Sequence, residues 1–119
     1  MSRPVLVFAY GTLCEAAVFR RVTGTLRPLD LARPAVLPGW RRVVLRGTPY
    51  PTLVRDSGGE TNGRLLAVTP AVLRRLHIYE GPAYRFLPVM VHVPARGGST
   101  RWRAHAWIAA NADPATPWP

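Results

Sequence analysis

The sequence has no lysine and only one cysteine, Cys14, among its 119 residues, so the chain can form no internal disulfide. It also lacks any apolar run close to the ~20 residues that a membrane-spanning helix needs. Its longest apolar run lies at residues 4–10. That run is too short for the apolar part of a signal peptide, and no small-residue cleavage site follows it. We therefore expect a soluble, cytoplasmic protein without a membrane segment.

Acidic residues are scarce as well. Six Asp and Glu stand against 16 basic residues, all of them arginine, which gives a formal net charge of +10. This charge, together with arginines beside Trp40, Trp102 and Trp107, suggests nucleic-acid binding by base stacking. The arginines come singly or in pairs in a chain rich in Ala, Pro and Gly, which indicates a composition bias instead. We expect nonspecific, salt-sensitive attraction to polyanions and no specific nucleic-acid partner.

The composition excludes general disorder, because 48% of the residues are apolar and 18% are charged. A chain of this length buries enough surface to fold without disulfides or metal ions. We expect one domain over residues 1–110. Residues 111–119 form a proline-rich C-terminal tail that we expect to lie on the surface or to fray.

The residue pattern predicts two helices and six or seven strands. Thr12 and Glu15 have the spacing of a capping box, which predicts a helix over residues 13–22 that ends at Gly24. Thr69 and Pro70 begin a second helix that runs to residue 79 or 80. Strands are expected at residues 3–9, 40–46, 52–56, 63–69, 84–93 and 101–110, with turns at 57–59 and 95–99.

The segment over residues 25–39 is rich in proline and has no clear period, so we expect a loop with at most one short strand near 35–37. Consecutive strands after residue 85 are joined by a short turn and are therefore antiparallel. The whole pattern indicates a mixed α+β domain, a strongly curled sheet or small mixed β-barrel of about six strands with two flanking helices.

The first candidate site is the loop formed by Tyr10, Gly11, Thr12 and Leu13. It joins a buried strand to a helix start, where the first N–H groups lack helical partners and can bind an anion or an oxyanion. A glycine between a strand and a helix is often only a turn, so the loop alone does not establish a function.

Glu80 is the second candidate. On a helical wheel with roughly 100° per residue, it lies in the apolar arc with Val72 and Leu76. Burial and the negative end of the helix dipole both disfavour a charged carboxylate there, which would raise the pKa of Glu80 toward neutrality. A general acid or base needs such a pKa. Alternatively, the last helical turn frays and Glu80 pairs with Arg85 at the surface.

Other reactive side chains give weaker signals. Cys14 lies near a predicted helix start, where a thiol pKa falls, but no histidine is near it in sequence and packing explains a lone cysteine as well. The three histidines, His77, His92 and His105, lack the spacing of metal ligands. We expect no metal and no cofactor.

Two groups of residues together resemble a known family. The run Phe8-Ala9-Tyr10-Gly11-Thr12-Leu13 resembles the opening of the γ-glutamylcyclotransferase-like (AIG2-like) family, and Tyr79-Glu80-Gly81 followed by Tyr84-Arg85 resembles its acidic motif. Intervening segments fit in order, including Pro38-Gly39-Trp40, Tyr50-Pro51 and residues 63–68. The resemblance covers residues 5–108.

The resemblance implies a compact β-barrel with flanking helices around a cavity. The catalytic glutamate of the family maps onto Glu80, and substrate would bind at Tyr10, Gly11, Thr12, Leu13 and Tyr84. The implied enzyme cyclises a γ-glutamyl group to 5-oxoproline and releases an amine, without metal or cofactor. We also expect a monomer or a weak homodimer. The alternative is a non-catalytic module of the same fold that binds a small carboxylated ligand.

Two positions depart from the family pattern. His77 stands where many members have Asp, and Trp107 stands where members often have Tyr. Both departures bear on the part of the pocket that would hold the leaving amine, so the sequence does not identify that amine.

Overall fold

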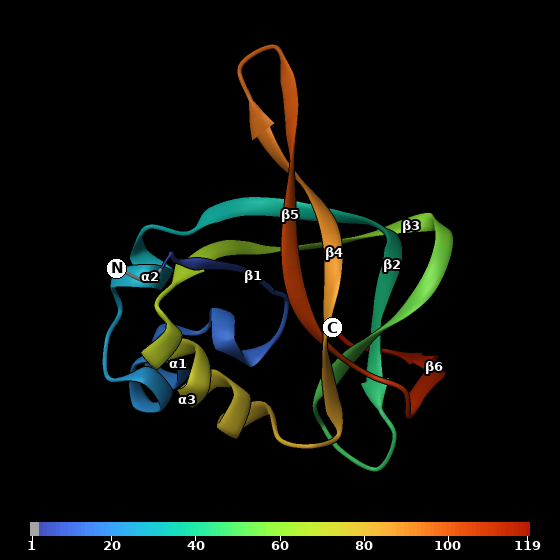
Figure 1. The fold of residues 1–119 in the computed structure, drawn as a ribbon. Coiled ribbons are helices and arrows are strands. Elements are labelled where there is room, and N and C mark those ends of the chain that lie inside the picture. The colour runs from blue at the N-terminus through green and yellow to red at the C-terminus, as the bar shows by residue number, and fades with distance from the viewer. Residues whose placement is uncertain (1–2) are drawn as a thin grey trace.

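The computed structural model describes residues 3–119, which fold into a sheet with helices along one side (Figure 1). Within these residues there are six strands, three α-helices and one 3-10 turn. The strands are β1 (Val5–Ala9), β2 (Arg33–Leu45), β3 (Pro51–Val68), β4 (Tyr84–Ala95), β5 (Gly98–Ala109) and β6 (Ala112–Pro117). The helical segments are η1 (Thr12–Cys14), α1 (Ala16–Thr23), α2 (Arg27–Asp30) and α3 (Pro70–Glu80).

The sheet curls back on itself. Its strand order is β3-β1-β5-β4-β2-β6, and β2 also pairs with β3, so five strands form a closed circuit with β6 outside it. The pairing of β1 with β5 is parallel and the other pairings are antiparallel. The predicted α+β class and the curled sheet are therefore confirmed, although α2 adds a short helix that the sequence did not predict.

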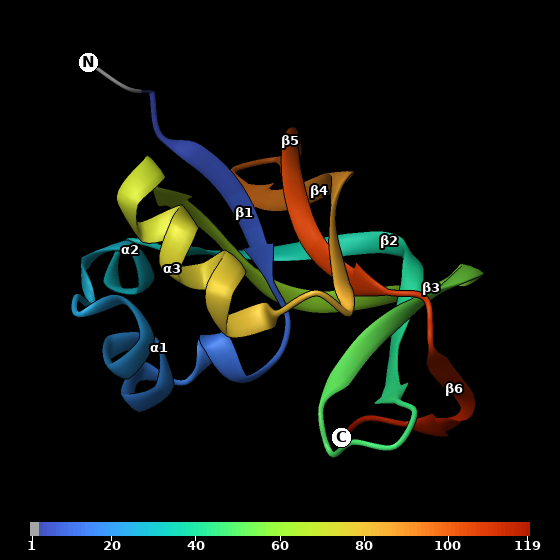
Figure 2. The same ribbon diagram turned by 60° about the horizontal axis from the view of Figure 1, so that its bottom comes forward.

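Apolar side chains fill both sides of β1, which explains its continuous apolar sequence. One cluster lies among the strands and includes Phe8, Leu37, Leu53 and Val91. The other lies between the sheet and the helices (Figure 2) and includes Val7, Phe19, Leu66, Leu76 and Trp107. Because β1 is buried on both faces, the chain that leaves its end at Ala9 starts from a fixed position.

The segment over residues 25–39 was predicted as a loop with a short strand near 35–37; the strand is confirmed, but the loop around it is wrong. It contains α2 and the first half of β2, which pairs with β3 from Arg33↔Leu65 to Val44↔Pro51. The prolines interrupt the alternating pattern that predicts a strand, and the pairing partner lies far along the chain. The predicted turn at 57–59 is also wrong, since β3 continues through it. A register shift between Pro38 and Trp40 lets both strands bend there without reversing.

The C-terminal tail lies on the surface, as one of the two expected alternatives had it, but it is paired and not frayed. Residues 112–117 form β6, which pairs with the outer edge of β2 through Leu45↔Ala112 and Val44↔Asp113. Most of β6 is exposed, and its prolines are tolerated because the strand lies at a sheet edge. Among residues 3–119, no helix is long and apolar enough to cross a membrane.

Candidate functional site

The loop after β1 takes a different form from the predicted capping box. Thr12 begins the 3-10 turn η1, and α1 starts only at Ala16, because Glu15 has an extended backbone (φ −86°, ψ 125°) that interrupts the helix. Neither helical segment has a side-chain cap. The Thr12 hydroxyl instead lies 2.9 Å from the Tyr79 hydroxyl. The predicted end of α1 at Gly24 is confirmed, with Gly24 in the left-handed conformation (φ 78°).

The start of η1 leaves backbone donors free. Within residues 3–119, the N–H groups of Gly11, Thr12 and Leu13 donate to no protein acceptor, whereas the next two N–H groups along the chain bond within η1. All three residues line the cavity described below. Consecutive unpaired N–H groups beside a cavity are an anion-binding arrangement.

Pro51 packs directly against this loop. A Cβ placed on Gly11 would lie 2.7 Å from Cγ of Pro51, which is closer than real Cβ contacts. Pro51 is buried at the start of β3 and its ring cannot swing aside. The close approach of the loop to this wall therefore requires glycine at position 11.

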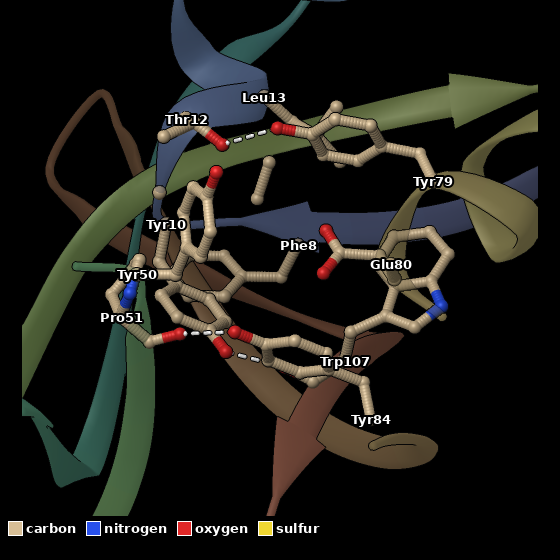
Figure 3. A pocket seen from close by; sticks show the side chains of 12 residues that line it. Phe8, Tyr10, Thr12, Leu13, Tyr50, Pro51, Tyr79, Glu80, Tyr84 and Trp107 are labelled. Carbon is tan, nitrogen blue, oxygen red and sulfur yellow. Dashed lines mark hydrogen bonds between the residues drawn. The ribbon is translucent and has the colours of Figure 1, made fainter. Parts of the chain in front are cut away.

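The helix that carries Glu80 forms as predicted. Thr69 caps α3 by accepting a hydrogen bond from the Val72 N–H (3.2 Å), and Leu76 is buried against the sheet. Gly81 ends the helix with φ 80°, and its N–H donates to the His77 carbonyl. Glu80 is thus the last helical residue, and Figure 3 shows its carboxylate pointing into the cavity.

Burial determines the charge state of Glu80. It raises the pKa of the Glu80 carboxyl from 4.5 to about 7. The alternative of a surface pair with Arg85 is not observed, since the one ion pair within residues 3–119 joins Arg41 to Asp56 (3.6 Å). A carboxyl with a pKa near 7 can take up and return a proton at neutral pH.

Two tyrosines on the cavity wall hold their protons tightly. The Tyr84 hydroxyl donates to the Pro51 carbonyl (2.8 Å), and the Tyr10 hydroxyl donates to the Trp107 carbonyl. Burial raises the pKa of Tyr84 to about 12 and that of Tyr10 higher still, helped in each case by the Glu80 charge. Among the residues that line the cavity, Glu80 is therefore the group that titrates near neutrality.

The cavity has a volume of about 200 Å³. Its walls come from β1, the following loop, β3, α3, β4 and β5. They comprise Phe8, Ala9, Tyr10, Gly11, Thr12, Leu13, Tyr50, Pro51, Tyr79, Glu80, Tyr84 and Trp107 (Figure 3). All six residues that the sequence predicted for the site lie here. Tyr50 and Tyr79 were not predicted, because only the pairing of β2 with β3 and the end of α3 bring them to the mouth.

The two positions that depart from the family pattern contact each other. The Trp107 indole Nε1–H donates to Nδ1 of His77 (3.0 Å), and both rings pack against Phe86. His77 thus supports a cavity residue without lining the cavity itself. Cys14 does not line it either. Its thiol lies 3.3 Å from the Ala9 carbonyl, and burial raises its pKa, which does not favour a nucleophile. Residues 3–119 contain no cluster of three or more potential metal ligands.

Comparison with known proteins agrees with this geometry. A family model described as gamma-glutamyl cyclotransferase, AIG2-like, matches residues 7–118. Protein AIG2 C of Arabidopsis thaliana is 33% identical over 108 residues, which cover 90% of this chain and 62% of that protein. AIG2-like protein B of the same plant is 29% identical over 108 residues, covering 88% and 60%. The chain spans less than two thirds of the length of these curated relatives.

Solved structures share the fold. A solution structure from Arabidopsis thaliana has a TM-score of 0.77 at 28% identity, covering 100% of this chain and 72% of that one. A structure named gamma-glutamyl cyclotransferase has a TM-score of 0.73 at 17% identity, covering 92% and 69%. At that identity the likeness shows the fold alone. Since the family model matches almost the whole sequence, the chain belongs to the gamma-glutamyl cyclotransferase, AIG2-like family.

Proposed function

We propose that this protein cyclises the γ-glutamyl group of a γ-glutamyl amine or peptide to 5-oxoproline and releases the amine. The observation that carries the proposal is the shared cavity of Glu80 and the loop after β1. Glu80, whose carboxyl has a pKa of about 7, lines the same cavity as three residues whose N–H groups have no protein acceptor. Intramolecular aminolysis needs both a proton shuttle and an oxyanion site.

In the first step, the α-amine of the substrate attacks its own γ-carbonyl carbon. A new C–N bond closes the five-membered ring, and Glu80 takes the proton that the attacking nitrogen loses. The carbonyl oxygen becomes an oxyanion, which the N–H groups of Gly11, Thr12 and Leu13 stabilise. Holding the chain in a ring-closing conformation lowers the entropic part of the barrier.

In the second step, the tetrahedral intermediate collapses. The bond from the former carbonyl carbon to the leaving nitrogen breaks, and Glu80 returns its proton to that nitrogen. The products are 5-oxoproline and a free amine, and Glu80 is again a carboxylate. One carboxyl serves as base and then as acid, which a pKa near the working pH permits.

Tyr10 and Tyr84 have a shaping role in this proposal. Their hydroxyl groups already donate to the carbonyls of Trp107 and Pro51. The single proton of each hydroxyl is already used in these hydrogen bonds, so each hydroxyl oxygen can only accept a hydrogen bond from a substrate. The two rings therefore bound the space for the γ-glutamyl moiety and supply no hydrogen-bond donor to it.

The experiment measures 5-oxoproline release from a panel of γ-glutamyl amines and γ-glutamyl peptides. We expect turnover of at least one compound, and a loss of roughly 10² to 10⁴ in the Glu80→Gln variant, the usual worth of general acid–base catalysis. The Glu60→Gln variant is the matched control, since Glu60 is exposed on β3. A panel compound that binds wild type without being cleaved would instead favour a non-catalytic binding module.

A further inference from the structure

One arginine, Arg42, contacts both the C-terminal segment and the loop of the candidate site. Arg42 is a half-buried residue of β2, and its guanidinium donates a hydrogen bond to the carbonyl of Tyr10 (2.9 Å). Residues 112–118 lie along the outer edge of the same strand. Arg42 does not line the cavity, so it acts on the loop from behind.

The Tyr10 carbonyl and the Gly11 N–H belong to one peptide unit. That unit is trans, so the two groups point in opposite directions. A guanidinium that holds the carbonyl on one side fixes the direction of the N–H on the other. A charge-assisted hydrogen bond also polarises the peptide, which makes its N–H a stronger donor.

Trp118 fixes the position of Arg42. The Arg42 guanidinium lies over the Trp118 ring, with Cζ 5.6 Å from the ring centroid. The Trp118 backbone N–H donates to the Arg42 carbonyl (3.4 Å), and its indole N–H donates to the Pro49 carbonyl (3.0 Å). Pro49 directly precedes Tyr50 and Pro51, which line the cavity, and Pro51 packs against the loop. Trp118 therefore contacts Arg42, which holds the loop, and Pro49, which precedes the cavity residues of β3.

We propose that Arg42 is a positioning residue for the oxyanion site, and that Trp118 holds it in place. This inference rests on the proposed function. Arg42 orients and polarises the peptide between Tyr10 and Gly11, so its effect falls on the step that develops negative charge and not on substrate binding. Oxyanion stabilisation of this kind raises kcat with little change in KM.

The test compares kinetics of three variants with wild type on a compound that wild type cleaves. Arg42→Gln should lower kcat by roughly tenfold to a hundredfold, the worth of a hydrogen bond to a charged group, with KM changed by less. Arg42→Lys should recover part of the loss because it keeps the charge. Arg41→Gln is the matched control, since Arg41 contacts Asp56 and the Pro114 carbonyl but not the loop.

A second measurement is independent of turnover. The amide ¹⁵N signal of Gly11 reports the hydrogen bond that its preceding carbonyl accepts. We expect Arg42→Gln to move this signal and Arg41→Gln to leave it in place, even if wild type cleaves no compound of the panel. If only the proposed function is wrong, no compound is cleaved and the kinetics cannot be compared, but the Gly11 signal still moves in Arg42→Gln.

Trp118→Ala keeps Arg42 itself and tests its anchor. Its loss in kcat should be smaller, about two- to fivefold, as expected for a single cation–π contact at the lower end of the usual range. It also provides a testable variant if Arg42→Gln does not fold, which thermal melting reveals. The inference is overturned if Arg42→Gln turns over within twofold of Arg41→Gln and the Gly11 amide signal does not move.

Discussion

The hydroxyl groups of Thr12 and Tyr79 lie 2.9 Å apart, which joins the loop after β1 to the last turn of α3 across the mouth of the cavity. The two residues are 67 positions apart in the sequence. Tyr79 directly precedes Glu80, and Thr12 carries one of the free N–H groups. This hydrogen bond therefore sets the spacing between the proton-accepting group and the anion-binding loop.

A double-mutant cycle with Thr12→Val and Tyr79→Phe measures this link. Each single variant should lose about 0.5–1.5 kcal/mol in the free energy of unfolding, the usual net worth of one hydrogen bond. The double variant should lose little more than either one, because both remove the same bond. Tyr50→Phe is the control, since within residues 3–119 its hydroxyl makes no hydrogen bond to protein. Strict additivity in denaturant unfolding would contradict the link.

The raised pKa of Glu80 predicts how stability depends on pH. Between about 4.5 and about 7 the folded protein binds more protons at this group than the unfolded chain. The contribution of Glu80 to the free energy of unfolding therefore falls as pH rises through this window and is constant above it. Each pKa unit corresponds to about 1.4 kcal/mol. At pH 8 the free energy of unfolding of Glu80→Gln should therefore be higher than that of wild type by roughly 1–3 kcal/mol.

The measurement is urea unfolding of both proteins at pH 4.5 and pH 8, with Glu60→Gln beside them. The gain should be close to zero at the lower pH, where Glu80 is protonated in the folded protein and about half protonated in the unfolded chain. Glu60 is exposed, so the Glu60→Gln difference should be the same at both pH values. A gain for Glu80→Gln that does not change with pH would show that the carboxyl is not desolvated.

The sequence predicted the site better than it predicted the sheet. Tyr10 and Glu80 were predicted from local signals, a turn after an apolar strand and the apolar arc of a helix. The capping box was a local signal too, but the extended backbone at Glu15 divides the predicted helix. At this point tertiary contacts, including the bond from Thr12 to Tyr79, outweighed the local preference.

Long-range strand pairing left no such local signal. Pro34 and Pro38 interrupt any period, so the sequence indicates only a short strand near 35–37, yet the whole of residues 33–38 pairs with residues 60–65 of β3. The same holds for β6, whose prolines suggest a frayed tail. Pro117 pairs with Val43 because a sheet edge tolerates a residue without an N–H. The pairing partner is needed to predict the full length of β2 and the presence of β6.

Gly11→Ala tests the contact between the loop and the cavity wall. A Cβ on residue 11 would lie 2.7 Å from Cγ of Pro51, which is closer than real Cβ contacts. The loop must move away from the wall, and we expect turnover to fall by at least about tenfold, as small misplacements of catalytic groups do. Gly58→Ala is the control because a Cβ there meets nothing within 4 Å. Equal turnover of the two variants would mean that the loop tolerates displacement.

His77 offers a test of how Trp107 and Glu80 depend on their surroundings. His77 is exposed, so water can replace it as acceptor for the buried Trp107 N–H. His77→Ala should therefore lower the free energy of unfolding by about 1 kcal/mol, and not by the ~3 kcal/mol expected for a fully buried donor without an acceptor.

His77→Asn keeps a neutral acceptor. His77→Asp adds a negative charge three residues before Glu80 on the same helix face, which should raise the pKa of Glu80 further. We therefore expect the rise of kcat/KM with pH to occur at higher pH in His77→Asp than in His77→Asn. Coincident pH profiles for these two variants would show that Glu80 does not set the pH dependence of turnover.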